Sequence, residues 1–236
     1  MKKAVLLILS MTMTAFSFSQ NTARDYYSSA LIHDSLKDYP SALSDIHQAL
    51  QLNVYYDSAY CLQGTICVRQ GEYKSAIRHL DKAIKLNSKY TDAYYARAIS
   101  KAELADYTGA VKDFNKAIEF DPAHVKAYYN RALAKGHLDE HASAVSDLDK
   151  AIELKSDYIQ AYYSRGFWKD VSGDFTGAVA DYRKVIDMDS SYREAYIALA
   201  TAMYQHGDKK EACEVMKQAA EKGSYMAEEL INKLCE

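Results

Sequence analysis

The sequence predicts an all-α fold, an α-solenoid built from stacked helix-turn-helix repeats. Three observations lead there. The chain repeats itself every 34 residues from Ala23 onward, six times without a gap. Each repeat has tyrosine at its fourth place and alanine at its twentieth. Apolar residues return at three- and four-residue spacing through places four to eleven and twenty to twenty-eight, the pattern of two amphipathic helices. A fixed period of this length is typical of a stacked array.

The repeats span residues 23–56, 57–90, 91–124, 125–158, 159–192 and 193–226. The fourth-place tyrosines are Tyr26, Tyr60, Tyr94, Tyr128, Tyr162 and Tyr196. The twentieth-place alanines are Ala42, Ala76, Ala110, Ala144, Ala178 and Ala212. Small residues at fixed places indicate that two helices approach closely there, and a tyrosine ring fills the space opposite.

Glycine and acidic residues mark the turn between the two helices of a repeat. Gly71, Gly173 and Gly207 stand at the fifteenth place, where a left-handed residue is needed to end a helix. The sixteenth place is acidic in every repeat, which favours the start of the second helix, because a carboxylate satisfies free backbone donors there.

A last amphipathic helix, residues 225–236, follows the final repeat. Its apolar face consists of Met226, Ala227, Leu230, Ile231 and Leu234, and we expect it to cap the open end of the array.

Two cysteines flank the turn before this helix. Cys213 and Cys235 each lie eleven positions from Ser224 (224 − 213 and 235 − 224), so in an antiparallel helix pair they face each other. We predict a disulfide between them. Cys61 and Cys67 lie on one helix, too far apart to be bridged, about 9 Å along the axis.

The sequence resembles the tetratricopeptide repeat family, whose units carry a large aromatic residue, small residues, a second aromatic residue and a late proline in this order. The fourth-place tyrosines, Gly64 and Gly166 at the eighth place, and Pro122 match that pattern. The resemblance implies a right-handed superhelix in which the first helix of each repeat lines a concave groove. It also implies that the fifth, ninth and thirty-fourth places supply much of that groove.

Carried onto this sequence, these places give an aromatic groove with an apolar floor. The fifth-place residues are Tyr27, Tyr95, Tyr129 and Tyr163, the thirty-fourth are Tyr56, Tyr90, Tyr158 and Tyr192, and the ninth are Leu31, Ile99, Leu133 and Phe167. We expect exposed rings here. A long aromatic and apolar stripe on a soluble protein usually has a partner, although each ring alone could serve only to pack neighbouring helices.

Charged residues inside repeats three, four and five follow a common pattern. The seventh place is arginine and the twenty-third is aspartate, whereas repeats two and six have Gln63 with His79 and Leu199 with Val215 at these two places. Places that vary together are expected to touch. We predict ion pairs between these arginines and an aspartate of the same or the neighbouring repeat, drawn from Arg97, Asp113, Arg131, Asp147, Arg165 and Asp181.

The first residues, 1–19, read as a secretory signal peptide: two lysines, a short apolar run and small residues near Gln20. No cysteine follows the run, so we do not expect a lipoprotein anchor. The remaining residues, 20–236, form the repeat domain, which we expect to be periplasmic or secreted and not inserted in a membrane. Its charge falls from −3 to −5, because two of 29 basic residues are removed against 32 acids. Nucleic acid is therefore a poor partner.

Catalytic motifs are scarce. His137, Glu140 and His141 match an H-x-x-E-H zinc pattern, but that pattern needs one continuous helix and the repeat places a turn between them. We expect no enzyme activity, no metal and no cofactor. The groove places also lack a cluster of cations that could clamp a carboxylate or phosphate.

The sequence therefore favours a non-catalytic protein-protein interaction module of the cell envelope, which binds a peptide or protein segment in the groove. Two alternatives stay open. Tyrosine faces also stack on sugars, so a glycan is a possible ligand, and the first repeat could serve self-assembly of a scaffold.

Overall fold

The computed structural model describes residues 21–235, and the predicted signal peptide, residues 1–19, lies outside the described residues. These residues form thirteen α-helices and no strand. The helices are α1 (Ala23–Ser35), α2 (Tyr39–Leu52), α3 (Asp57–Arg69), α4 (Tyr73–Leu86), α5 (Thr91–Glu103), α6 (Tyr107–Phe120), α7 (Val125–Gly136), α8 (His141–Leu154), α9 (Ile159–Val171), α10 (Phe175–Met188), α11 (Arg193–His206), α12 (Lys209–Glu221) and α13 (Tyr225–Leu234). None of them is long and apolar enough to cross a bilayer.

The described residues form two compact units, residues 21–54 and residues 55–235. In the described part of the first unit, α1 and α2 pack against each other. Ala30, Ala42, Ile46 and Ala49 are fully buried. This pair is one helix-turn-helix repeat.

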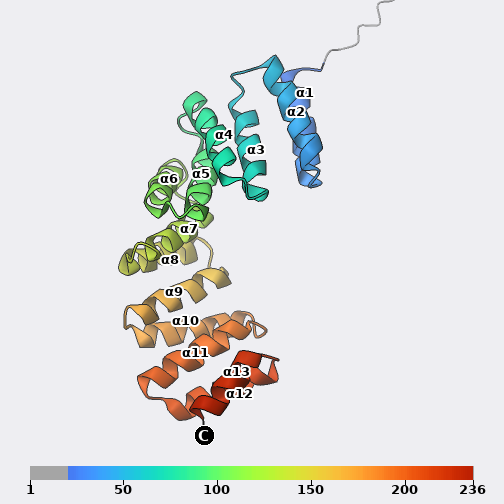
Figure 1. Cartoon of the computed structure of the whole chain (residues 1–236). Helices are drawn as coiled ribbons and strands as arrows, with labels where there is room; N and C mark the ends of the chain where they lie inside the picture. Colours follow the sequence, from blue (N-terminus) through green and yellow to red (C-terminus); the bar gives the residue numbers. More distant parts are fainter. Residues whose placement is uncertain (1–20, 236) are drawn as a thin grey trace, which may run out of the picture. The chain divides into compact units, whose positions relative to one another are not determined.

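The second unit is an α-solenoid, as the period predicts. Each helix from α3 to α13 packs on the next one along the chain, and the odd-numbered helices α3 to α11 also touch each other in sequence (Figure 1). Core residues come from the repeated small positions, because every twentieth-place alanine is fully buried. The eighth place is tight as well: a Cβ on Gly64 would lie 2.5 Å from Cγ of Leu80. Helices of one repeat can approach closely only while these positions stay small.

The turn inside each repeat is left-handed, as expected from its glycines. Gly71, Gly173 and Gly207 have positive φ angles. The other three repeats place Lys37, Ala105 and Asp139 in the same region, with φ near 60°. The following acidic residue caps the second helix in three cases, where Asp38, Asp106 and Asp174 accept a hydrogen bond from the backbone two or three residues into the helix. Glu72, Glu140 and Asp208 make no such bond, contrary to expectation.

Helix α13 ends the array and packs on α12. A disulfide joins Cys213 to Cys235, with the Cα atoms 5.7 Å apart. Ala227 is buried, and Leu230 and Ile231 pack against the core of the last repeat. Met226 was expected on this apolar face but is 59% exposed, because it lies at the start of α13, beside a pocket rather than over the core.

Candidate binding face on the first helices

Five tyrosines line one face of the second unit, and we call them the tyrosine strip: Tyr95, Tyr129, Tyr158, Tyr163 and Tyr192. Within a repeat, the fifth-place ring of the first helix meets the residue that ends the repeat. The ring centroids of Tyr129 and Tyr158 are 5.0 Å apart, and those of Tyr163 and Tyr192 are 5.3 Å apart. In the third repeat His124 takes the second position, 4.7 Å from Tyr95. Repeats three, four and five thus each place one aromatic pair on this face.

Polar and electrostatic contacts connect these pairs along the array. The side-chain amide of Asn130, on α7, donates to the Tyr95 hydroxyl on α5 at 3.0 Å. The pKa of Tyr158 is raised to about 12, first by burial and then by the neighbouring Tyr129 and Tyr95. The pKa of Tyr192 is also raised. Burial is the largest cause, and the neighbouring Tyr163, Glu194 and Tyr129 contribute in that order. The strip is therefore continuous from α5 to α11.

The rings of the strip are half-buried rather than exposed, which corrects our expectation. Tyr95 packs against Phe114 of α6, and Tyr163 against Tyr182 of α10. Tyr95 and Tyr163 therefore contribute to the packing of their repeats as well as to the surface. Phe167, at the ninth place of α9, is 46% exposed.

Two pockets open on this face, one near each end of the strip. The smaller, of about 320 Å³, lies between α5 and α7 and includes the ninth-place residues Ile99 and Leu133. The larger, of about 690 Å³, lies at the C-terminal end between α9, α11 and the start of α13. Concave, mostly apolar surfaces with a few polar groups are the usual form of a binding site.

The remaining predicted groove residues are not part of the strip. Tyr27 and Leu31 lie on α1, in the first unit, and Leu31 is 43% exposed. Tyr56 and Tyr90 are the N-terminal caps of α3 and α5. The fifth place of the second repeat holds Cys61, whose thiol bonds to Tyr90. Burial raises the pKa of Cys61 to about 11, so this thiol is unreactive at neutral pH.

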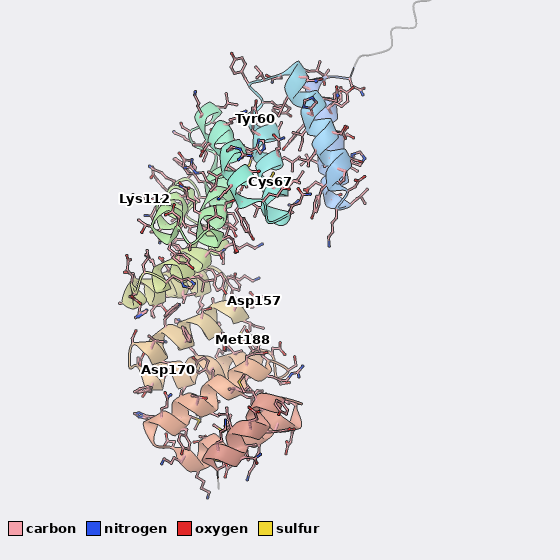
Figure 2. All side chains as sticks on the ribbon, viewed as in Figure 1. Tyr60, Cys67, Lys112, Asp157, Asp170 and Met188 are labelled. Atoms are coloured by element: carbon pink, nitrogen blue, oxygen red, sulfur yellow. A yellow bond between two sulfur atoms is a disulfide. The ribbon has the colours of Figure 1, made fainter. Side chains whose placement is uncertain are left out.

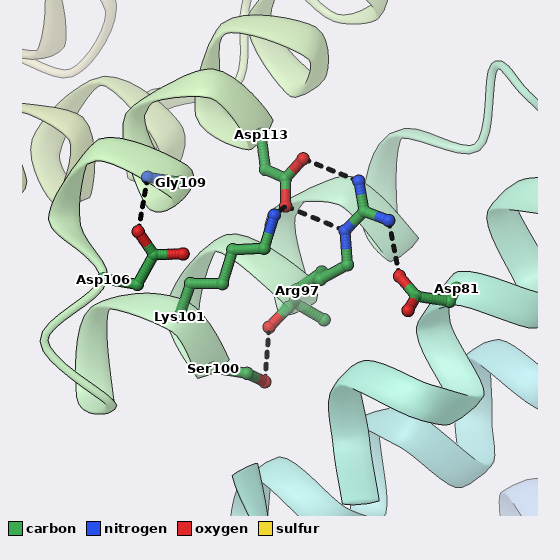
Figure 3. Close-up of polar contacts among 8 residues, drawn as sticks. Asp81, Arg97, Ser100, Lys101, Asp106, Gly109 and Asp113 are labelled. Carbon is green, nitrogen blue, oxygen red and sulfur yellow. Dashed lines mark hydrogen bonds and ion pairs between the residues drawn. The ribbon is translucent and has the colours of Figure 1, made fainter. Parts of the chain in front are cut away.

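Arginine at the seventh place holds the repeats together. In the third repeat, Nε and Nη2 of Arg97 donate to the two carboxylate oxygens of Asp113, at 2.8 and 2.7 Å (Figure 3). Lys101 reaches the same carboxylate at 2.7 Å. Nη1 of Arg97 points the other way and bonds Asp81 of the preceding repeat at 2.6 Å (Figure 3). One guanidinium thus joins α4, α5 and α6.

The same arrangement recurs in the next two repeats. Arg131 pairs with Asp147 and Lys135, and Arg165 with Asp181 and Lys169. Nη1 of Arg131 donates to Asn115, and Nη1 of Arg165 donates to Asp149, in each case on the preceding repeat. All three arginines also lie over the fourth-place tyrosine, 5.3 to 5.4 Å from the ring centroid. Burial lowers the pKa of Arg97 and Arg165, but the bonds to their aspartates outweigh it and raise the pKa above its ordinary value.

The bond to the preceding repeat was missed by the sequence reasoning. Its partners, Asp81, Asn115 and Asp149, all stand at the twenty-fifth place. The signal was present, because a hydrogen-bonding residue stands there in each repeat that precedes an arginine, but an offset of sixteen residues backward was not considered.

The histidines of the H-x-x-E-H match lie apart in structure. His137 is the C-terminal cap of α7 and its ring stacks on Tyr107, whereas His141 begins α8 and stacks on Trp168. Within residues 21–235, no cluster of metal-binding side chains occurs.

Comparisons with known proteins now settle the family. Profiles described as TPR repeat match residues 64–104 and 100–139, and two described as tetratricopeptide repeat match residues 125–158 and 171–227. The chain belongs to the tetratricopeptide repeat proteins. Among proteins with curated descriptions, none matches this sequence.

Solved structures share the fold of this tetratricopeptide repeat protein. MamA is 26% identical, with a TM-score of 0.67 over 75% of this chain and 94% of MamA. YrrB, described as a TPR protein with an unusual peptide-binding site, is 20% identical, with a TM-score of 0.72 over 80% of this chain and 98% of YrrB. The C-terminal part of a TPR protein from Cytophaga hutchinsonii is 20% identical, with a TM-score of 0.73 over 89% and 88%. The fold is that of protein-protein interaction modules, which are generally non-catalytic.

Proposed function

We propose that this protein binds an extended segment of another protein along the tyrosine strip. The observation that carries the proposal is the continuity of the strip, in which ring pairs on α5, α7 and α9 follow one another and end in two pockets. Half-buried rings are held in fixed orientations by Phe114 and Tyr182 beneath them. Rigid amphipathic rings make good binding surfaces, because little conformational entropy is lost when a ligand covers them.

We further propose that the protein works in the cell envelope, in the periplasm or outside the cell. The signal-peptide pattern of residues 1–19 and the Cys213–Cys235 disulfide both support this location, since disulfides persist in oxidising compartments.

Selection from a random peptide display library tests the binding proposal. Residues 20–236, purified with the disulfide intact, are expected to enrich peptides rich in aromatic and apolar residues. The test variant is Phe167→Ser, which changes an exposed ring of the binding face and leaves the ring pairs in place. The matched control is Val54→Ser, which changes an exposed apolar residue outside the second unit.

Enriched peptides should lose affinity for Phe167→Ser by about tenfold, as expected when a ring in a binding site is removed. Val54→Ser should bind as the unaltered chain does. No enrichment of any peptide, together with saturable binding on an array of oligosaccharides, would instead indicate that the same rings bind a glycan.

A further inference from the structure

The pocket at the C-terminal end of the strip contains a carboxylate that no other group in the pocket neutralises. Its walls are mainly apolar and aromatic, with Tyr163 and Phe167 from α9, Ile197 from α11, and Tyr225 and Met226 from α13. Asp170, in the last turn of α9, also lines it (Figure 2). A volume of about 690 Å³ is sufficient for a long side chain and part of its backbone.

One oxygen of Asp170 is fully enclosed without a hydrogen bond. Oδ1 has no donor within reach among the described residues. Burial alone raises the pKa of Asp170, with no contribution from a neighbouring cation. An enclosed acceptor without a donor costs about 1–3 kcal/mol, and a ligand that brings a donor recovers that cost once the Asp170 side chain turns this oxygen toward the pocket. Asp170 therefore favours a ligand that carries N–H groups.

The charges around the pocket select the sign of such a ligand. Glu194 also lines the pocket, and it raises the pKa of Tyr163 after burial does, so its carboxylate lies close to that ring. The one cation among the lining residues, Arg193, donates from Nη1 to the backbone oxygen of Gly223, another lining residue, at 3.1 Å. The lining groups thus present two carboxylates against one cation whose guanidinium holds a backbone turn.

Exposed ring faces in the same pocket also suit a cation. Phe167 is 46% exposed and Tyr225 is 73% exposed. A cation over a ring face is attracted by the negative charge of the π-system. The chain uses this combination internally, where Arg165 lies over the Tyr162 ring and pairs with Asp181.

We infer that this pocket takes the cationic side chain, lysine or arginine, of the bound protein segment, between the aromatic walls and the Asp170 carboxylate. This inference rests on the proposed function and adds a specificity to it: the segment carries a basic residue where its chain passes α9 and α13, next to the apolar residues that cover the rest of the strip.

Synthetic peptides made from the best library binder test the inference. Each lysine or arginine of that peptide is replaced in turn by glutamine, and affinities are measured by fluorescence polarisation against the unaltered chain and Asp170→Asn. The control is Asp187→Asn, which removes one charge from an exposed residue of α10 outside this pocket. Circular dichroism melting checks that each variant is folded.

One basic residue should account for about a tenfold loss on replacement by glutamine, the size expected for a cation in a partly desolvated aromatic site. Asp170→Asn should lower the affinity for the basic peptide by a similar factor and leave the affinity for the glutamine peptide unchanged. Asp187→Asn should change neither affinity. Should Asp170→Asn melt early, Phe167→Leu, which removes a ring face and keeps an apolar side chain, is expected to give the same selective loss.

The outcomes separate this inference from the proposed function. Absence of any binder overturns both. Binders that tolerate glutamine at every basic position, or that keep their preference for the basic peptide in Asp170→Asn, overturn the cation pocket alone. Binders that instead need a free carboxylate would assign the pocket to Arg193 and also overturn it.

Discussion

Seven described residues adopt left-handed backbone angles, and three of them are not glycine: Lys37, Ala105 and Asp139. A Cβ in this region is strained by about 1 kcal/mol relative to glycine. Ala105→Gly should therefore stabilise the protein by about 1 kcal/mol, less the small entropy that glycine adds to the unfolded chain. The measurement is the urea midpoint of the purified chain.

Gly71 offers the reverse substitution as a matched control. It has φ of 76°, and a Cβ added there would meet nothing within 4 Å, so Gly71→Ala changes backbone strain without a clash. We expect a loss of about 1 kcal/mol. Midpoints that move in the same direction for Ala105→Gly and Gly71→Ala would show that backbone strain does not govern this turn.

Tyr158 makes stability depend on alkaline pH. Its pKa is raised from 10.0 to about 12, first by burial and then by the neighbouring Tyr129 and Tyr95. Between these values the unfolded chain loses the proton and the folded chain keeps it, so the free energy of unfolding should fall as pH rises from 10 and level off above 12.

Tyr158→Phe removes this ionisation. Unfolding in urea, measured at intervals across that range, should show a shallower fall for Tyr158→Phe than for the unaltered chain. Tyr55→Phe, at a 77% exposed tyrosine outside the strip, controls for loss of a hydroxyl. Identical pH slopes for the unaltered chain and Tyr158→Phe would contradict the assignment.

Among the helical elements, the charged network has an apolar counterpart in the same chain. The sixth repeat carries Leu199, Met203 and Val215 where the fourth carries Arg131, Lys135 and Asp147. Leu199 and Met203 are buried in the core of the last repeat. Both solutions fill the same place between the two helices of a repeat, one with charge and one without.

Replacing the charged residues of the fourth repeat by the apolar residues of the sixth distinguishes the effect of ion pairing from that of side-chain packing. Arg131→Leu alone should destabilise the protein by about 3 kcal/mol, because Asp147 is 5% exposed and loses its bidentate partner. Arg131→Leu with Lys135→Met and Asp147→Val should recover most of that loss, since an apolar set of similar volume often replaces a buried ion pair without cost. The fourth repeat is the best host, because the group left behind on the preceding repeat is the neutral Asn115.

Thermal melting of the single and triple variants decides the matter. A triple variant less stable than Arg131→Leu would mean that the charges do more than neutralise one another, and that the link to the preceding repeat is essential.

Helix α13 depends on its disulfide more than the inner helices depend on any one contact. It packs mainly on α12. The Cys213–Cys235 bond closes a loop of 22 residues, for which chain entropy predicts about 3 kcal/mol. Reduction, or Cys235→Ser, should speed amide hydrogen exchange in α13 while α5 to α8 keep their protection. Equal loss of protection throughout would contradict a local role.

The sequence predicts those structural features that recur from repeat to repeat. The turn at place fifteen, the buried alanines and the arginine-aspartate pairs recur, so comparison between repeats reveals them. Features that occur once give no such signal. Asp170 lacks a partner, Met226 faces a pocket rather than the core, and Arg193 holds the Gly223 carbonyl. These depend on where α13 meets α9 and α11, a junction without a counterpart in the other repeats.

For the tyrosines, the sequence pattern does not predict how deeply each ring is buried. Five of the eight predicted tyrosines form the strip, but the half-burial of Tyr95 and Tyr163 depends on contacts with Phe114 and Tyr182 of the second helices, which the sequence did not pair with them. The rings therefore serve both stability and the surface.

For the molecule as a whole, the second unit is an array in which repeats three, four and five each add one aromatic pair to a common face. A ligand that covers several repeats must therefore cross successive first helices, α5, α7 and α9, rather than lie along one of them. Affinity should then rise with the number of strip positions that a peptide covers. Once one part of the peptide is bound, each further contact forms within the complex and does not have to bring two free molecules together. Truncation of the best library peptide from either end checks this, and affinity that depends on one end alone would contradict it.

The central claim, that the first helices carry the binding face, is tested most directly by locating a bound peptide. The best library binder, synthesised with a photoreactive diazirine at each apolar position in turn, is irradiated with the full chain, and the attached residues are identified by mass spectrometry. The account predicts attachment at Ile99, Leu133 and Phe167, along the strip and its pockets. Attachment confined to exposed residues of the second helices, such as Lys112 on α6 or Lys184 on α10, would contradict it.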